Sequence, residues 1–184
     1  VAYEQIPPVM IQALIAAEDD RFFEHSGLDL LVTLRSIFNY VVAGGERVAG
    51  GSTITQQVAR EYFLSRDFSL VRKFKEWILA LRIEREFSKE EILELFFNTT
   101  FFGQHSYGIA AAAQTYFGKE LMDLTISDAA ILAGIPQGPS IRNPIYSPEN
   151  AAERRTYVLR RMRELQFITR QEHDAALAVP VRAE

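Results

Sequence analysis

The sequence predicts an all-α fold. Apolar residues recur three and four positions apart along most of the chain, which is the spacing of one helix face. Residues that suit helix N-caps precede several of these stretches, and glycines follow them. No long stretch alternates apolar and polar residues as a half-buried strand does. The 184 residues, of which 48% are hydrophobic, suit one domain with a sizeable core and room for a lobe or flap.

Composition excludes several classes of protein. The net charge of -4 gives no overall basic signature for nucleic acid, so no nucleic-acid partner is expected. The chain has no cysteine, which excludes disulfides and thiolate metal sites. No uninterrupted apolar run approaches the roughly 18 residues of a membrane span. Because the chain starts at Val1, without a Met or a signal-like segment, we expect a domain cut from a larger protein.

The first two predicted helices lie at 7–23 and 30–43. Pro7-Pro8 opens the first, since proline is tolerated in a first turn. Asp29 is a suitable N-cap for the second, which Gly44-Gly45 should stop. The second helix is apolar nearly all round. It therefore fits either a core helix or a flap whose apolar face meets a membrane surface.

A polar helix face is predicted after Gly50-Gly51. Thr53 can cap this helix, and Gln56 can complete a capping box. Four polar residues share one face at helical spacing: Thr53, Gln56, Gln57 and Arg60. Such a face suits sugar hydroxyls and anions, or it is plain solvent surface.

A long helix is predicted from an N-cap at Ser69 to about Phe87. Its expected buried face carries five apolar residues: Leu70, Phe74, Trp77, Ile78 and Leu81. Arg72, Lys73 and Glu76 lie on the opposite side, three and four positions apart. They form either a surface ion pair or two cations presented beside a carboxylate, an arrangement that suits a phosphate-bearing ligand.

The rest of the chain is also helical in its pattern. Ser88 and Glu91 predict a capping box, and Gly118 predicts a helix end. The predicted helices are 89–98, 109–117, 127–135, 148–165 and a short one after a cap at Thr169.

Glu18 is the first candidate for chemistry, because it lies on an apolar stripe. The apolar residues at helical spacing from it are Ile11, Leu14, Ile15 and Phe22. Burial disfavours the charged form of a carboxylate and raises its pKa, which suits a group that exchanges a proton near neutrality. The alternative is that Glu18 is a half-solvated helix end beside Arg21. Spacing alone leaves both interpretations open.

Seven stretches, in this order, resemble the peptidoglycan glycosyltransferase domain of class A penicillin-binding proteins and of monofunctional glycosyltransferases. The stretches that carry the resemblance are EDDRFFEHSG (18–27), GGSTITQQ (50–57), RKFKE (72–76), KEEILELFFN (89–98), YGIAAAAQTYFGK (107–119), LAGIPQGPS (132–140) and RRTYVLRRM (154–162). Together they cover nearly the whole chain, and their order makes the match specific.

The resemblance implies a lysozyme-like all-α fold, with a large head lobe and a smaller membrane-associated jaw lobe at about 28–68 within a single domain, 1–184. It implies polymerisation of lipid II into β-1,4-linked glycan, with inversion and release of polyprenyl pyrophosphate. The implied place is the extracytoplasmic face of the bacterial cytoplasmic (inner) membrane. The implied partners are lipid II, the lipid-linked glycan strand, the membrane surface, moenomycin-type inhibitors and a fused or adjacent transpeptidase domain.

The resemblance also implies roles for matched residues. Glu18 matches the base that takes the proton from the acceptor hydroxyl. Glu76 matches a second glutamate that assists departure of the pyrophosphate, directly or through a divalent cation (Mg²⁺ or Mn²⁺), or positions the cations beside it. No organic cofactor is implied. Arg72 and Lys73 match residues that hold the pyrophosphate.

Further matches line the implied substrate site. The residues that match donor-site contacts are Ser52, Gln56, Gln57 and Arg60. Those that match the loop around Glu18 are Asp19, Phe22, His25 and Gly27. Those that match the lining of the cleft are Asn98, Tyr107 and Gly108. Arg60 departs from the family, which usually has lysine there, so the phosphate contact changes from a point charge to a planar fork.

Two other functions fit parts of the pattern. One is a lysozyme-like lytic transglycosylase or glycan hydrolase, and the other is a non-catalytic lipid II-binding module. The RKFKE cluster disfavours the first, because an enzyme that cleaves glycan has no lipid pyrophosphate to hold. The presence of both Glu18 and Glu76 disfavours the second.

Overall fold

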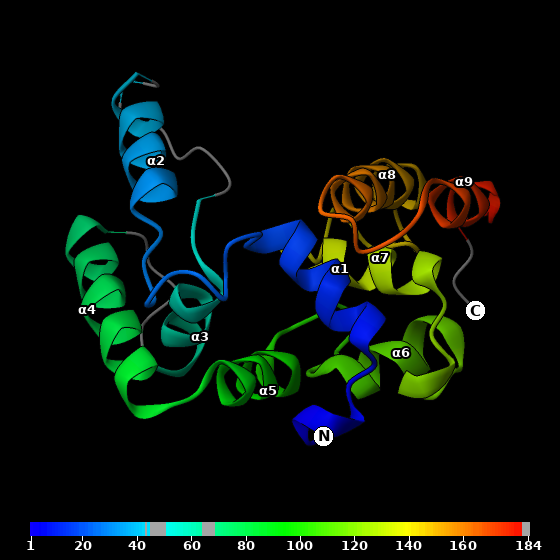
Figure 1. Cartoon of the computed structure of the whole chain (residues 1–184), viewed down its shortest axis with the longest axis horizontal. Coiled ribbons are helices and arrows are strands. Elements are labelled where there is room, and N and C mark those ends of the chain that lie inside the picture. The colour runs from blue at the N-terminus through cyan, green and yellow to red at the C-terminus, as the bar shows by residue number, and fades with distance from the viewer. Residues whose placement is uncertain (43, 45–50, 64–68, 182–184) are drawn as a thin grey trace. The chain divides into compact units, whose positions relative to one another are not determined.

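The computed structural model describes residues 1–42, 44, 51–63 and 69–181. Figure 1 shows these residues as helices joined by loops. They contain no β-strand, and their one isolated antiparallel bridge joins Phe101 to Tyr107. The all-α prediction is therefore confirmed. Predictions that fall on Ala43, Gly45 and Gly50 lie outside the described residues.

The helices follow the predicted order. They are α1 (Pro8–Glu18), α2 (Leu30–Val42), α3 (Ile54–Phe63), α4 (Leu70–Glu86), α5 (Lys89–Thr99), α6 (Ile109–Phe117), α7 (Ile126–Gly134), α8 (Pro148–Glu164) and α9 (Arg170–Ala178), with short 3-10 helices at Tyr3–Gln5 and Leu121–Asp123. None of the described helices is long and apolar enough to cross a membrane.

The chain divides into two compact units. The first comprises residues 1–20 and 97–184, and the second comprises 21–96, so the division falls inside α5. The predicted jaw range, 28–68, lies within the second unit.

The first unit is built around α7, whose residues Ser127–Gly134 are all buried. Helices α1 and α8 pack against α7 and against each other, and α9 packs on α8 (Figure 1). The largest fully buried side chains of this unit come from several helices: Met10, Leu14, Phe97, Phe102, Ile109, Tyr116 and Leu132. The end of α1, which carries Glu18, is therefore held by two neighbouring helices.

Local capping signals predicted most helix starts correctly. Ser69 accepts the backbone N–H of Arg72 at 3.0 Å, and Asp29 accepts those of Leu31 and Val32. The predicted capping box forms at the start of α5, and a similar one forms at the start of α9. In each case a short polar side chain satisfies an N–H that the helix leaves without a partner.

Two predicted boundaries were wrong. Helix α1 ends at Glu18 rather than near Phe23, because Asp19 adopts a non-helical backbone (φ -160°, ψ 78°). The chain passes from the first unit into the second between Asp20 and Arg21, just after this point. Helix α7 starts at Ile126, one residue earlier than predicted, because Thr125 is its cap and forms the box with Asp128.

The predicted buried face of α4 was also wrong. Leu70 is 66% exposed and Phe74 60%; Ile78 and Leu81 are exposed too, and Trp77 is half-buried. The buried residues are instead Arg72, Glu76, Ala80 and Ile83. Helix α4 packs this mixed face on α3. Apolar periodicity failed here because charged side chains that pair with each other can be buried as well.

Helix α2 does not match the core-helix interpretation. Its apolar residues are largely exposed, and Leu30 reaches 70%. The others with exposed side chains are Leu31, Leu34, Ile37, Phe38 and Val42. A set of apolar side chains this exposed on one helix indicates a surface that meets something other than water.

Gly27 provides a test of the second unit's packing. Its φ is +93°, and a Cβ would lie 2.8 Å from the carbonyl oxygen of Ala80. Gly44 also has a positive φ (+67°), but no described atom lies within 4 Å of its Cβ position. We expect Gly44→Ala to cost about 1 kcal/mol for the left-handed backbone, and Gly27→Ala about 1–3 kcal/mol more for the clash. Urea unfolding of both variants measures the difference, and equal losses would contradict the packing described.

Candidate active site

Glu18 is the last residue of α1, and its side chain is only 10% exposed. Leu14 and Ile15, which precede it on the predicted apolar stripe, are buried. The guanidinium of Arg154 on α8 donates from Nη2 to Glu18 Oε1 at 3.2 Å. The half-solvated interpretation is therefore wrong. Glu18 is a largely buried carboxylate that contacts a cation.

The loop that follows Glu18 is anchored within the second unit. Phe22 is fully buried, and the ammonium of Lys89 lies 4.3 Å from the centre of its ring. The same ammonium donates to the backbone oxygen of His25 at 2.7 Å. The Gly27 N–H donates to His25 Nδ1, and Gly27 O accepts from Thr53 Oγ1 at 2.7 Å. Phe22, His25 and Gly27 thus hold this loop in place.

Asp29 connects the same loop to α2. Arg21 donates to both of its carboxylate oxygens, at 2.6 and 2.8 Å. Burial acts to raise the pKa of Asp29, but the hydrogen bonds from Arg21 and from the Val32 N–H outweigh it, so the pKa is lowered. The pair therefore stays ionised at neutral pH and fixes the start of α2.

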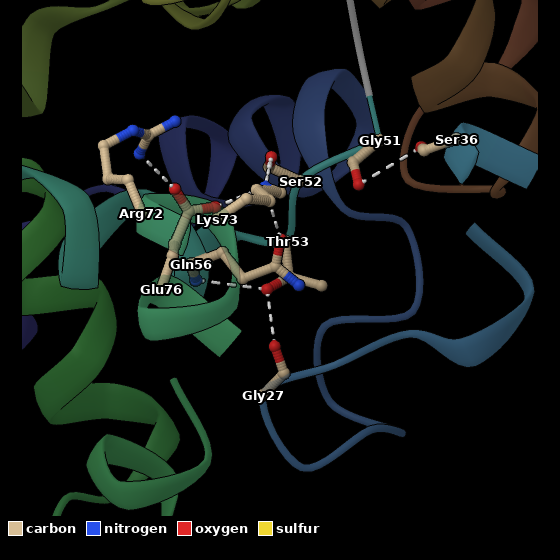
Figure 2. Close-up of polar contacts among 9 residues, drawn as sticks. All are labelled: Gly27, Ser36, Gly51, Ser52, Thr53, Gln56, Arg72, Lys73 and Glu76. Carbon is tan, nitrogen blue, oxygen red and sulfur yellow. Dashed lines mark hydrogen bonds and ion pairs between the residues drawn. The ribbon is translucent and has the colours of Figure 1, made fainter. Parts of the chain in front are cut away.

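Glu76 is the centre of a buried ionic cluster in the second unit (Figure 2). Its side chain is 0% exposed. Oε2 accepts from Arg72 Nη1 at 2.8 Å, and Oε1 accepts from Lys73 Nζ. The three residues lie at i, i+1 and i+4 on α4, so one helix turn brings both cations to the carboxylate. The surface ion-pair interpretation of these residues is therefore wrong.

Lys73 links the cluster to the segment before α3. Its Nζ also donates to Ser52 Oγ at 2.7 Å and to Gln56 Oε1 at 3.2 Å, so all three ammonium protons have acceptors. Burial lowers the pKa of Lys73, and the charges of Arg60 and Arg72 lower it further against the opposing effect of Glu76. An anion that binds this ammonium must replace one of the three acceptors.

The glutamines of α3 are part of this buried surface. Gln56 is fully buried and Gln57 nearly so, which excludes the plain solvent-surface interpretation for both. The Nε2 of Gln56 is buried without a hydrogen-bond partner among the described residues. An unsatisfied buried donor costs stability, so this amide is available to a ligand oxygen.

The donor set at Glu76 offers little to a metal ion. Both carboxylate oxygens already accept hydrogen bonds from cationic side chains. No group of three or more His, Cys, Asp or Glu residues in the described ranges could hold a metal. A metal ion would add a third cationic group there and be repelled, so the residues around Glu76 do not fit the implied divalent cation.

Three further candidates lie together in the first unit. Asn98 exchanges hydrogen bonds with the amino group and carbonyl of Val1. Gly108 has a φ of +85°, and a Cβ there would lie 2.9 Å from the Asn98 carbonyl oxygen. Tyr107 is exposed and packs against Phe101, with ring centres 4.9 Å apart. The turn at 101–107 therefore brings Gly108 back beside Asn98.

The candidates thus fall into two groups. Glu18, Asp19, Asn98, Tyr107 and Gly108 belong to the first unit, and all the others belong to the second. Sequence reasoning missed Arg154, which is 136 residues from Glu18. It lies in the RRTYVLRRM stretch, but nothing in that stretch indicates which arginine turns inward.

Comparisons with known proteins identify the family of the chain. A family model described as transglycosylase matches residues 1–163. The chain therefore belongs to the transglycosylase family, as a glycosyltransferase domain of the class A penicillin-binding protein type.

Similar proteins are named penicillin-binding protein 1A. Those of Vibrio cholerae and Haemophilus influenzae are 50% and 48% identical, over 97% and 100% of this chain. That of Escherichia coli is 45% identical over 100% of the chain. This chain spans 22%, 21% and 21% of those three proteins. A crystal structure of the Haemophilus influenzae protein matches with a TM-score of 0.51 and 44% identity, over 70% of this chain and 17% of that one. The lysozyme-like all-α fold implied by the resemblance is thereby supported.

Removing the Glu76 carboxylate should destabilise the fold. Glu76→Ala leaves two cations beside a buried void, which we expect to cost about 3–5 kcal/mol in the free energy of unfolding. The control is Glu86→Ala, an exposed glutamate at the end of the same helix, with an expected change within about 0.5 kcal/mol. Denaturant unfolding checks both. Similar losses for the two variants would show that the ion cluster does not hold α4.

Proposed function

We propose that this domain polymerises lipid II into β-1,4-linked glycan with inversion and release of polyprenyl pyrophosphate. The observation that carries the proposal is the buried Arg72–Lys73–Glu76 cluster, with Ser52 and Gln56 at its edge. It presents two cations and an unpartnered amide donor, which is the chemistry that a departing pyrophosphate requires. Membership of the transglycosylase family supports the same reaction.

In this proposal the cluster stabilises the leaving group. The bond from the donor sugar to the pyrophosphate breaks, and negative charge grows on the phosphate oxygens. Arg72 and Lys73 stabilise that charge, with a phosphate oxygen replacing Ser52 or Gln56 on the ammonium. Glu76 keeps both cations aimed at one place. Phosphoglycolipid inhibitors of the moenomycin type would use the same contacts.

Glu18 is the proposed base. It accepts the proton of the acceptor's 4-hydroxyl as that oxygen bonds to the donor sugar's anomeric carbon, on the face opposite the leaving pyrophosphate. The result is a β-1,4 bond from an α-linked donor. Its low exposure supports this role, because a buried carboxylate does not exchange its proton freely with water.

The surface of the second unit supports a membrane setting. Exposed apolar residues cover much of α2, and α4 carries others at Leu70, Val71 and Phe74. A lipid-linked substrate lies in a membrane, so an enzyme that uses it benefits from an apolar contact surface. We place the domain on the extracytoplasmic face of the bacterial cytoplasmic membrane. The much greater length of the relatives is consistent with a fused transpeptidase domain in the parent protein.

The two alternatives explain less. A glycan hydrolase or lytic transglycosylase needs an acid, but it has no use for two buried cations on a second carboxylate. A non-catalytic binding module has no use for a buried glutamate at a helix end.

Incubation with labelled lipid II tests the function. The protein should convert it into glycan polymer, whereas shortening of preformed glycan without polymer would overturn the proposal.

Glu18→Gln should lower kcat by about 10²–10⁴-fold with little change in KM, because the amide keeps the shape and loses the base. Retained turnover in this variant would refute the base assignment alone.

The lowered pKa of Lys73 gives a pH test. The ammonium should lose its proton at a lower pH than an ordinary lysine, so polymerisation should decline on the alkaline side as the pH rises through that pKa. Lys73→Arg keeps the charge, which should move the alkaline limb to higher pH. Lys75→Arg, an exposed site on the same helix, is the control. Coincident alkaline limbs for wild type and Lys73→Arg would contradict a role for this charge.

A further inference from the structure

Arg154 connects α8 to the end of α1 through a single nitrogen. Nη2 donates to the Ala17 carbonyl oxygen at 3.1 Å and to Glu18 Oε1 at 3.2 Å. Arg154 is 8% exposed, so both contacts are largely shielded from water. One donor group therefore ties the carboxylate of Glu18 to its own helix end.

The location of Glu18 makes a neighbouring cation necessary. The C-terminus of a helix carries partial negative charge and carbonyls without intrahelical partners, which disfavours a carboxylate there. The next residue, Asp19, is buried and adds charge of the same sign. Asp20 is paired with Arg161, and the single charged residue of α7, Asp128, is paired with Lys119. Arg154 is a cation placed to offset the charge of Glu18.

The fold makes room for Arg154 at some cost. Gly134 on α7 has no Cβ, and a Cβ there would lie 2.7 Å from Arg154 Cγ. The Tyr157 ring lies 4.5 Å from the guanidinium carbon. The Nε of Arg154 is buried without a hydrogen-bond partner among the described residues, which lowers stability. The arrangement fixes the Arg154 side chain beside Glu18.

We propose that Arg154 is a positioning residue that orients the Glu18 carboxylate and keeps it ionised, ready to accept the acceptor's proton. The inference rests on the proposed role of Glu18 as the base. Arg154 itself needs no contact with substrate, because its effect passes through Glu18.

The test compares two variants with one control in the lipid II polymerisation assay. Arg154→Met keeps the apolar stem and removes the charge. Gly134→Ala suits a helix and leaves the charge in place, but it displaces Arg154. Arg160→Met is the matched control, because Arg160 lies on the same helix and is exposed. Each protein is measured for kcat, KM, the pH dependence of kcat and thermal unfolding.

We expect both variants to lose at least about tenfold in kcat, with KM within about twofold, because general-base catalysis is worth about 10²–10⁴-fold. The acid limb of the kcat profile should move to higher pH in both, since a carboxylate without its cation is protonated more readily. A purely structural role would lower the unfolding temperature without moving that limb. The Arg160→Met control should match wild type.

Wild-type kcat and pH profile in both variants would overturn the inference while the proposed function stands. If Arg154→Met does not fold, the kcat and pH profile of Gly134→Ala alone test the inference, with the same outcomes. A wild-type protein that makes no polymer from lipid II would overturn the proposed function, and this inference with it.

Discussion

The buried carboxylate of Glu76 is the constraint on which the second unit depends. An ionised glutamate with no exposure is tolerated only when cations and hydrogen-bond donors surround it, and Arg72 and Lys73 supply them. Meeting that requirement turns the charged face of α4 inward, onto α3. The apolar face then points outward, as Leu70 and Phe74 do. One ionic interaction therefore determines both the candidate site and the exposed apolar surface.

The features that were predicted correctly are those that depend on residues close together in the sequence. The caps at Ser69 and Ser88 were confirmed because a hydroxyl and an N–H three residues apart meet whatever the rest of the chain does. The burial of α4 was predicted wrongly because it depends on Ser52 and Gln56, which reach Lys73 from another segment. The early end of α1 follows from the non-helical backbone of Asp19. Periodicity contains no information on either.

The same distinction between local and long-range contacts applies to the candidate site. The resemblance identified Glu18, Glu76 and the cations from ordered motifs, and the structure adds which of them contact one another. The pairing of Glu18 with Arg154 joins residues 136 positions apart, and no local pattern distinguishes Arg154 from the other arginines of α8. Only the packing of α1, α7 and α8 selects it, with Gly134 leaving the space that its side chain fills.

The two glutamates are held in different ways, and the difference bears on their roles. Glu76 accepts a hydrogen bond from a cation on each oxygen, which leaves it poorly placed to receive a hydroxyl proton. Its geometry suits a residue that aligns two charges. Glu18 contacts the Arg154 guanidinium through Oε1. It lies at a helix C-terminus, where the backbone carries partial negative charge. These contacts support Glu18 as the proposed base and Glu76 as the proposed support for the leaving group.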